Sequence, residues 1–242
     1  MTTVLKLGGS VVTEKDVPRT VDEAALETAA AALAGRDDIV IVHGGGSFGH
    51  HHADRHGVTT TEGTHDPAAI GDIHGAMTRL NATVVEVLAD AGVPALPVHP
   101  MSVGHRDADG TLTFPTGQVR AMLSEGFVPV LHGDGVLHAG RGATVLSGDE
   151  IVVRLAEALD ANRVGVCSAV PGVYDGDGSV IDAISSIEEV ADALDASEAT
   201  DVSGGMAGKV RALLKLDAPA HVFGLAGLEA FLEGGAPGTR ID

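Results

Sequence analysis

Three short segments of the chain combine glycines with lysine or histidine, residue types that commonly hold phosphate groups. Residues 6–10 read Lys-Leu-Gly-Gly-Ser, residues 43–50 hold three consecutive glycines and end on a histidine, and residues 203–209 place three glycines before a lysine. Glycine lets backbone N–H groups approach a bound anion closely, and the side-chain nitrogens add hydrogen-bond donors. Together the segments predict a phosphate-binding site, although a single glycine cluster is equally typical of a tight turn.

The lysines of this chain are scarce, and they gather at these segments. Of its four lysines, Lys6, Lys15 and Lys209 lie in or beside glycine-rich stretches, and only Lys215 does not. A single lysine is usually a solvated surface residue. Three of four beside glycine loops instead favour a function in holding anionic groups.

The composition excludes several classes of partner. Thirty-four acidic against fifteen basic residues give a formal net charge of −19, which argues against binding to nucleic acid or to an anionic membrane surface. Few lysines, few aromatic residues and much Ala, Gly and Val resemble the composition of cytoplasmic proteins from salt-accumulating organisms. Because concentrated salt screens repulsion between carboxylates, we expect the fold to loosen in low salt.

Cysteine usage and hydropathy point to a soluble cytoplasmic protein. The single cysteine, Cys167, lies in an apolar run and cannot form an internal disulfide, so a reducing compartment and a core position are expected. The N-terminus lacks the pattern of a signal peptide, and no uncharged apolar run reaches the roughly 20 residues that span a bilayer.

Apolar runs alternate with amphipathic stretches along the chain. Strands are predicted at residues 4–7, 39–42, 128–131, 163–167 and 220–223, and helices at 21–35, 67–91, 148–160, 186–195 and 206–217. Strands separated by helices indicate a mostly parallel sheet covered on both faces, an α/β fold of the αβα sandwich type. Turn residues predict hairpins around 105–110 and 137–142. No linker divides the chain, so we expect one domain over residues 1–242.

The helix predicted at residues 67–91 carries an apolar stripe. Most of that stripe should pack on the sheet. His74 and Met77, which lie nearest the glycine loop, are the two residues expected to line a substrate pocket.

Two other interpretations of the glycine loop and its histidines deserve weight. Gly44, Gly46 and Gly49 fit the dinucleotide fingerprint G-x-G-x-x-G, but they lead into residues 50–52, three histidines, rather than into a helix with small apolar residues. A zinc site at the histidine run is the weaker alternative. Adjacent side chains point in different directions, and no cysteine or clear i, i+4 histidine pair completes a set of ligands.

Residues 6–10, 43–50, 133–135, 147–149 and 203–209 together resemble the amino acid kinase superfamily, and the resemblance spans essentially the whole chain. A histidine at the end of the glycine loop is typical of the isopentenyl phosphate kinase branch. This resemblance implies an amino acid kinase fold, transfer of the γ-phosphoryl group of ATP to isopentenyl phosphate in an archaeal mevalonate pathway, Mg²⁺ as the companion of ATP, and a homodimer.

The same resemblance implies roles for individual residues. It implies a catalytic set made of Lys6, Lys15, His50, Asp149 and Lys209, with Asp149 pairing with both Lys6 and Lys209. It implies contacts with ATP from Lys6, Gly8, Gly9, Ser10, Gly46, Tyr174, Asp175, Gly205 and Lys209. It implies contacts with the acceptor phosphate from Gly45, Gly46, His50 and Gly148. No residue is expected to bind metal directly, since Mg²⁺ would be carried by ATP.

Departures from the family pattern and rival activities remain open at this point. Ala169 stands where relatives often carry Asp, and Ser203 where they usually carry Thr. The first rival is a phosphonate kinase of the fosfomycin type, whose glycine loop and histidine look similar. A dinucleotide-binding oxidoreductase would rest on the glycine fingerprint alone.

Overall fold

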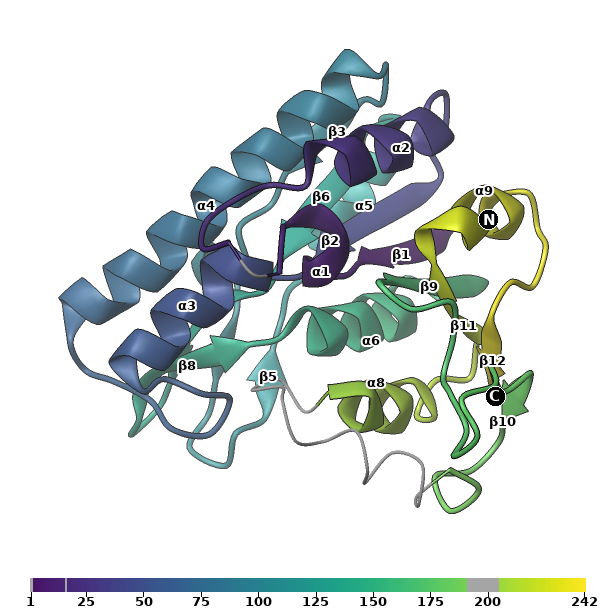
Figure 1. The fold of residues 1–242 in the computed structure, drawn as a ribbon. Coiled ribbons are helices and arrows are strands. Elements are labelled where there is room, and N and C mark those ends of the chain that lie inside the picture. The colour runs from purple at the N-terminus through teal and green to yellow at the C-terminus, as the bar shows by residue number, and fades with distance from the viewer. Residues whose placement is uncertain (1, 16, 191–204) are drawn as a thin grey trace.

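The computed structural model describes residues 2–15, 17–190 and 205–242, and a large twisted sheet forms its centre (Figure 1). Eight strands lie in the order β10-β12-β11-β9-β1-β2-β6-β3, and every neighbouring pair is parallel except β11 with β12. The strands are β1 (Thr3–Leu7), β2 (Ile39–His43), β3 (Ala95–Pro97), β6 (Val128–His132), β9 (Arg163–Ser168), β10 (Ala183–Ile184), β11 (Ala220–Gly224) and β12 (Thr239–Ile241). The prediction of a mostly parallel sheet is confirmed.

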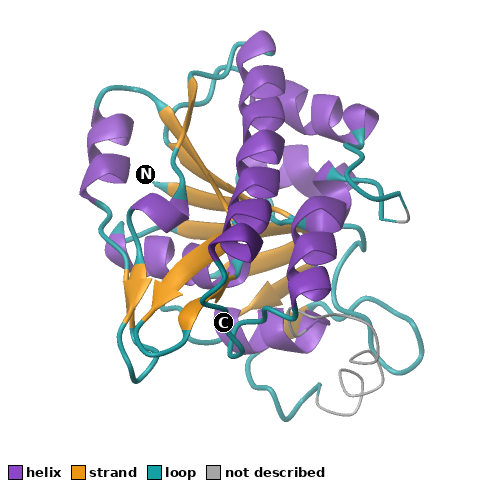
Figure 2. Cartoon of the chain, turned by 90° about the vertical axis from the view of Figure 1, so that its left-hand side faces the viewer, coloured by secondary structure: helices purple, strands orange, loops and turns teal. Residues whose placement is uncertain are grey.

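Helices cover both faces of this sheet, as the two views show (Figure 1, Figure 2). One face packs against α1 (Gly9–Val12), α2 (Glu23–Leu33), α4 (Pro67–Asp90) and α9 (Leu228–Leu232), and the other against α5 (Gly117–Ser124), α6 (Gly148–Ala158) and α8 (Gly205–Leu213). Short 3₁₀ turns form η1 (Pro100–Ser102) and η3 (Leu225–Gly227).

Alternation along the central strands explains the two-sided core. Val4 belongs to the apolar cluster on the α6 side, whereas Leu5 and Leu7 belong to the cluster on the α2 and α4 side. Successive side chains of a strand point to opposite faces. Lys6 therefore faces the same side as Val4, toward α6, and this places its charge for the site described below.

A second, smaller sheet lies beside the main one. Its order is β5-β4-β7-β8, formed by β4 (His105–Arg106), β5 (Leu112–Thr113), β7 (Asp134–His138) and β8 (Gly142–Leu146). The pairs β4–β5 and β7–β8 are antiparallel, so both predicted hairpins are confirmed.

All five predicted strands are confirmed to within one residue at each end. The helix predicted at residues 206–217 is too long, because α8 ends at Leu213. Of the helix predicted at residues 186–195, the part at 186–190 has no helical structure, and residues 191–195 lie outside the described residues.

One helix at the site was missed. The glycine loop leads directly into α3 (Gly46–His56), so the expectation that residues 50–52 do not belong to a helix is wrong. α3 has no apolar stripe to reveal it, since only His52 and Ala53 are buried, and it packs on α4. It ends at Gly57, whose φ of 63° is the left-handed conformation that commonly terminates helices.

Within the described residues, no helix is long and apolar enough to cross a membrane.

Candidate functional site

A cavity of about 700 Å³ opens where β1, β2 and β9 end. It gathers parts of all three glycine-rich segments, together with the first turn of α6. Among the residues predicted for the site, it is lined by Lys6, Gly8, Gly9, Ser10, Lys15, Gly45, Gly46, His50, Met77, Gly148, Asp149, Gly205 and Lys209. The carboxyl ends of parallel strands are where α/β proteins bind ligands, so the position agrees with the general rule.

Backbone hydrogen bonds hold the loops together at this edge. Gly44 N donates to Leu7 O at 2.9 Å, and Gly8 N donates to Cys167 O at 2.8 Å. The loops after β1, β2 and β9 are thereby fixed relative to one another before any ligand arrives.

Three of the glycines are also required because the first two loops touch. A Cβ atom built on Gly9 or Gly44 would collide with the backbone of the other loop, and one built on Gly46 would collide with Thr13 Oγ1. Thr13 completes the contact, since its hydroxyl donates to Gly9 O at 2.8 Å and accepts from Ser47 N at 3.0 Å. Sequence reasoning missed Thr13, which belongs to no glycine-rich motif.

Lys6 and Asp149 form a buried ion pair at the wall of the cavity. Lys6 Nζ lies 2.6 Å from Asp149 Oδ1, and the two side chains are 6% and 13% exposed. Gly148 leaves room for the lysine, because a Cβ there would approach Lys6 Cε to 3.3 Å. The ion pair fixes the direction of the Lys6 ammonium group.

Lys209 does not join that ion pair in this structure, so the expected pairing of Asp149 with both lysines is only half correct. Lys209 Nζ donates instead to Gly205 O at 3.3 Å. Gly205 lies one turn earlier in α8, within reach of the lysine stem.

Two eleven-residue helices begin at the cavity, α3 at Gly46 and α6 at Gly148. The amino ends of helices carry free N–H groups and a partial positive charge, which favour anions. Glu150, in the first turn of α6, is engaged elsewhere, since both its carboxylate oxygens accept from Arg106 at 2.6 Å. Lysines and helix ends thus bring hydrogen-bond donors for an anion to this edge of an acidic protein.

The lining contributed by α3 and α4 differs in character from the lysines. His50 lies in the early part of α3, which packs on α4, and the lining also includes Ile73 and Met77 of α4 together with Val58. A Cβ on Gly49 would come within 2.9 Å of Met77 Sδ, so α3 and α4 are in close contact here. This part of the cavity joins an imidazole to an apolar surface.

His74 does not itself line the cavity, in contrast to its predicted role. Its Nδ1 donates to Asp134 Oδ2 at 2.9 Å, and it is the buried Asp134 that reaches the lining. That hydrogen bond raises the pKa of His74. Asp134 lies in the Gly-Asp-Gly segment at residues 133–135, where the motif was visible but no role was assigned to its carboxylate.

Tyr174 and Asp175, which were predicted to contact ATP, lie outside the cavity lining. Tyr174 is 41% exposed, and Asp175 Oδ1 accepts from Asp177 N and Ser179 N at 2.9 and 2.8 Å; neither residue lines the cavity. Ala169, the departure from the family pattern, does line it. Ser203 lies outside the described residues. Ser168 and Val170 complete this side and carried no signal in the sequence, whereas Met206 lies within the glycine-rich segment at residues 203–209 but was given no role.

A buried histidine, His43, ends β2 beneath the glycine loop. Burial lowers its pKa to about 4, so it is neutral near pH 7. Its Nδ1 lies 3.0 Å from Gly44 O, its Nε2 lies 3.1 Å from Asn81 Oδ1, and its ring stacks on His132 at 5.6 Å. A neutral imidazole has one N–H, so it donates to one of these two oxygens.

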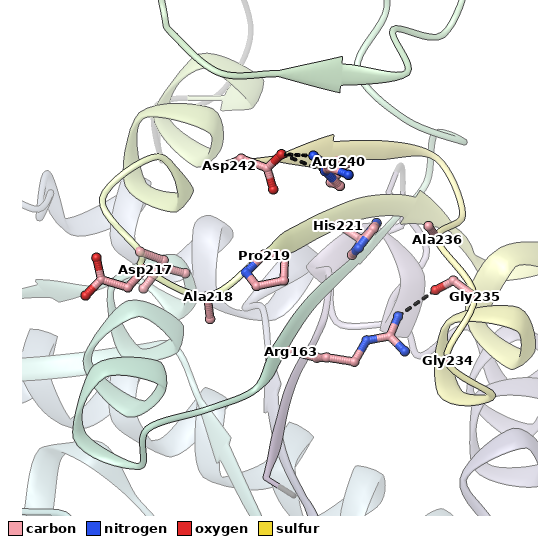
Figure 3. Close-up of a pocket in the computed structure, with 11 residues that line it drawn as sticks. Arg163, Asp217, Ala218, Pro219, His221, Gly234, Gly235, Ala236, Arg240 and Asp242 are labelled. Carbon is pink, nitrogen blue, oxygen red and sulfur yellow. Dashed lines mark hydrogen bonds and ion pairs between the residues drawn. The ribbon is translucent and has the colours of Figure 1, made fainter.

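A second hollow of about 560 Å³ lies at the other ends of the strands, near the starts of β9 and β11 (Figure 3). Arg163 there donates to Gly235 O at 2.5 Å, and Arg240 pairs with Asp242. None of the residues predicted for the site lines this hollow.

Comparison with known proteins gives consistent matches. The model of the amino acid kinase family matches residues 1–218. The chain is 60% identical to the isopentenyl phosphate kinase of Haloferax volcanii over 241 residues, covering 98% of this chain and 97% of that protein. It is 34% identical to the isopentenyl phosphate kinase of Methanothermobacter thermautotrophicus over 229 residues, covering 88% and 86%.

Solved structures agree with these sequence matches. An X-ray structure of isopentenyl phosphate kinase superposes with a TM-score of 0.84 at 28% identity, and a substrate complex of isopentenyl phosphate kinase with 0.77 at 25%, each over 100% of both chains. Carbamate kinase from Giardia lamblia bound to AMP-PNP has a TM-score of 0.67 at 15% identity over 99% of this chain and 97% of that one, which shows a shared fold.

Proposed function

The chain belongs to the amino acid kinase family, and from that premise we propose that it transfers the γ-phosphoryl group of ATP to isopentenyl phosphate, forming isopentenyl diphosphate and ADP. The observation that carries the proposal is one cavity lined by Lys6, Lys15 and Lys209 and also by His50 beside an apolar wall. The 60% identity to the Haloferax volcanii enzyme supports the same acceptor.

The cationic groups hold the transferring phosphoryl group. Phosphoryl transfer depends on in-line positioning and on neutralising the charge of the equatorial oxygens. Lys6, aimed by Asp149, and the backbone N–H groups of Gly8, Gly9 and Ser10 face the ATP phosphates. Lys15, which is exposed, and the half-buried Lys209 complete the contacts with the γ-phosphoryl group.

The acceptor binds at the amino end of α3. His50 and the N–H groups of Gly45, Gly46 and Gly148 hold its phosphate. A phosphate monoester has a second pKa of about 6, so its oxygen is already a nucleophile near neutral pH and no general base is required. That oxygen bonds to the γ-phosphorus of ATP as the bond to the bridging oxygen of ADP breaks.

Mg²⁺ would accompany ATP and would supply positive charge that offsets part of the charge on the phosphates. Two of the three carboxylates that line the cavity are engaged, since Asp149 pairs with Lys6 and Asp134 accepts from His74 and from Gly135 N, while the third, Asp54, is exposed. This residue set fits an ion held mainly by the nucleotide. The nearby helix ends and lysines take the remaining negative charge.

The apolar wall favours a prenyl acceptor over a small phosphonate. Ile73, Met77 and Val58 offer surface to a five-carbon chain and no partner to the polar groups of a phosphonate of the fosfomycin type. The dinucleotide oxidoreductase is not supported either, because the close matches are kinases. The reason given against it, that three histidines follow the glycine loop in place of a helix with small apolar residues, is nevertheless weakened, because those histidines lie in α3.

We further propose one domain over residues 1–242, whose N-terminal part binds the acceptor and whose C-terminal part, including Tyr174 and Asp175, binds the nucleotide. A homodimer, a cytoplasmic location and adaptation to high salt belong to the same proposal. The dimer rests on family resemblance, and the other two rest on composition. Light scattering in molar KCl tests the dimer against the chain mass of 24.4 kDa.

ADP release with a panel of acceptors tests the proposed activity. The assay contains ATP, Mg²⁺ and about molar KCl, with isopentenyl phosphate, dimethylallyl phosphate, fosfomycin or no acceptor. We expect strong turnover with isopentenyl phosphate. Activity with fosfomycin and none with either prenyl phosphate would assign the enzyme to the phosphonate kinases.

A further inference from the structure

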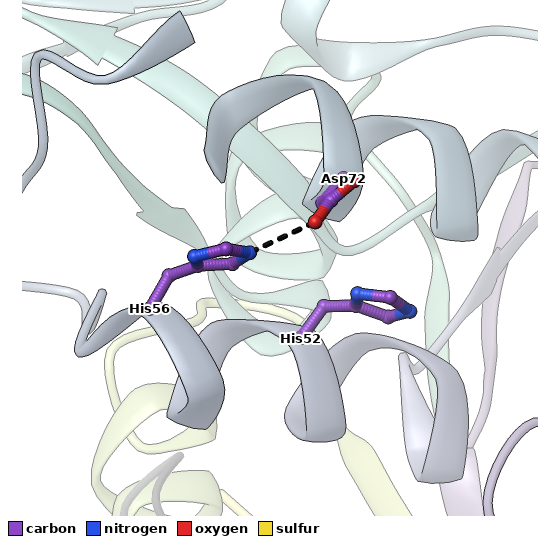
Figure 4. A group of neighbouring side chains, drawn as sticks. All are labelled: His52, His56 and Asp72. Carbon is purple, nitrogen blue, oxygen red and sulfur yellow. Dashed lines mark hydrogen bonds and ion pairs between the residues drawn. The ribbon is translucent and has the colours of Figure 1, made fainter. Parts of the chain in front are cut away.

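A cluster of potential metal ligands lies between α3 and α4. His52 and His56 are separated by four residues on α3 and lie on one face of it, opposite Asp72 of α4 (Figure 4). One ligand atom from each of the three residues lies within 4.8 Å of the others. The expectation that the chain has no clear i, i+4 histidine pair is therefore wrong, because His52 and His56 form one on α3, a helix that was not predicted.

The state of His52 sets this cluster apart from an ordinary surface ion pair. His56 Nε2 lies 3.0 Å from Asp72 Oδ2, which alone would be a solvated pair. His52 is only 6% exposed, and both of its ring nitrogens are buried without a hydrogen-bond partner among the described residues. A buried polar group without a partner is costly, and such groups in native proteins call for an explanation.

We propose that His52, His56 and Asp72 bind one transition-metal dication of the Zn²⁺ class, which joins α3 to α4. Two imidazoles and a carboxylate are a common three-residue set for zinc, with a fourth position left to water. The Asp72 side chain is 48% exposed, so water and the ion can reach the site from solvent.

The geometry is close to what such an ion requires. Zinc bonds of about 2.0–2.1 Å at tetrahedral angles place ligand atoms about 3.3 Å apart. The His56–Asp72 separation is already 3.0 Å, and the remaining ligand atom lies within 4.8 Å. A modest rotation of the His52 ring closes the set.

The ligand types favour a metal that bonds to nitrogen. Two imidazoles and one carboxylate are typical of Zn²⁺, whereas Mg²⁺ and Ca²⁺ take oxygen ligands.

An ion here would fix one wall of the cavity. His50 and Ala53 of α3 and Ile73 of α4 line the cavity, and Asp72 adjoins Ile73. Clamping the two helices would hold their spacing constant. The inference itself rests on the cluster and does not depend on which reaction the cavity performs.

Titration of the full chain with Co²⁺ and Zn²⁺ tests the site. The protein carries no polyhistidine tag, is stripped with a chelator, and is studied in about molar KCl to suppress loose binding to its many carboxylates. We expect one equivalent of Co²⁺ to give the visible absorption typical of a site with four or five ligands. Added Zn²⁺ should displace Co²⁺ and abolish that absorption. His56→Ala and Asp72→Ala, both at accessible positions, should each weaken Zn²⁺ binding at least tenfold by calorimetry.

Two matched variants separate this cluster from the rest of the histidines. His65→Ala removes an exposed histidine elsewhere, and His51→Ala removes the exposed neighbour of His52; both should leave metal binding unchanged. Zn²⁺ should raise the melting temperature of the wild type and of both controls, but not that of His56→Ala. Less than half an equivalent bound, affinity retained in both His56→Ala and Asp72→Ala, or equal loss in His51→Ala would overturn the proposal.

Discussion

The three cationic side chains assigned to the phosphates occupy different environments. Lys6 is buried and ion-paired with Asp149, Lys209 is half-buried, and Lys15 is exposed. A buried charge must be paired to be tolerated, and the 2.6 Å contact with Asp149 meets that requirement while aiming the ammonium group. At the scale of single residues, the site thus combines one rigid cation with two more accessible ones.

Replacement of His50 tests the acceptor assignment. His50→Ala should lower kcat/KM for isopentenyl phosphate about 100-fold or more, because it removes the donor that holds the acceptor phosphate, whereas His50→Gln should retain part of the activity through its amide. Steady-state kinetics with either substrate varied gives the answer. Wild-type kinetics in His50→Ala would remove the histidine from the mechanism.

The buried His43 predicts a particular dependence of stability on pH. Its pKa is about 4 in the fold, against 6.5 for a free histidine, so below pH 6.5 the unfolded chain takes up a proton that the folded chain does not. The contribution of His43 to the free energy of unfolding should be constant above pH 6.5 and should fall by up to ~3 kcal/mol as the pH drops toward 4. His132, whose pKa burial also lowers, adds in the same direction.

Denaturant unfolding between pH 4.5 and 7.5, in constant KCl, measures this effect. His43→Gln should flatten the pH profile, whereas His65→Gln, at an exposed position, should follow the wild type. Equal slopes for wild type and His43→Gln would show that another group is responsible.

At the scale of elements, the loops after β1 and β2 are built around each other. Their glycines allow the two loops to pack closely, and they also leave the backbone open to a phosphate. A glycine cluster can therefore be both a tight turn and a phosphate-binding loop. Gly46 shows both, because its φ is +46° and it begins α3 at the cavity.

Two glycine substitutions distinguish the effect of the tight loop contact at Gly46 from the general effect of alanine on helix stability. Gly46→Ala should lower the free energy of unfolding by about 2 kcal/mol or more, since a Cβ would collide with Thr13 and the backbone conformation disfavours alanine. Gly71→Ala, inside α4 with open space around it, should raise it by about 0.5–1 kcal/mol. Urea unfolding measures both; a neutral Gly46→Ala would contradict the account of the loop crossing.

Elements with strong apolar patterns could be predicted from the sequence. Elements and site residues whose positions depend on contacts with distant segments could not. Residues 39–42 form an apolar run, residues 4–7 are apolar apart from Lys6, and α4 has a clear stripe, so all were predictable. α3 is polar and gains its place from packing on α4, which no local pattern reveals. Likewise His74 was placed in the cavity by proximity along the helix, while its partner Asp134 could be found only in three dimensions.

At the scale of the molecule, a net charge of −19 surrounds a cavity lined with lysines and helix amino ends. The self-repulsion of such a surface is screened over about 10 Å at 0.1 M salt and about 3 Å at 1 M. The fold must therefore depend on salt more strongly than that of a protein with balanced charge.

Circular dichroism at different salt concentrations tests this dependence. The melting temperature should be about 10 °C or more lower in 0.1 M than in 2 M KCl, because unscreened repulsion opposes the compact state. The same experiment in sucrose of matched viscosity controls for solvent effects unrelated to charge. A melting temperature independent of KCl would contradict the halophilic interpretation.

Direct observation of the product tests whether the protein forms isopentenyl diphosphate. Wild-type protein, ATP, Mg²⁺ and isopentenyl phosphate are followed by ³¹P NMR in about molar KCl. The account predicts that the monophosphate signal is replaced by the two coupled signals of a prenyl diphosphate, with one ADP formed for each. An unchanged monophosphate signal, with ATP either intact or hydrolysed to orthophosphate, would contradict it.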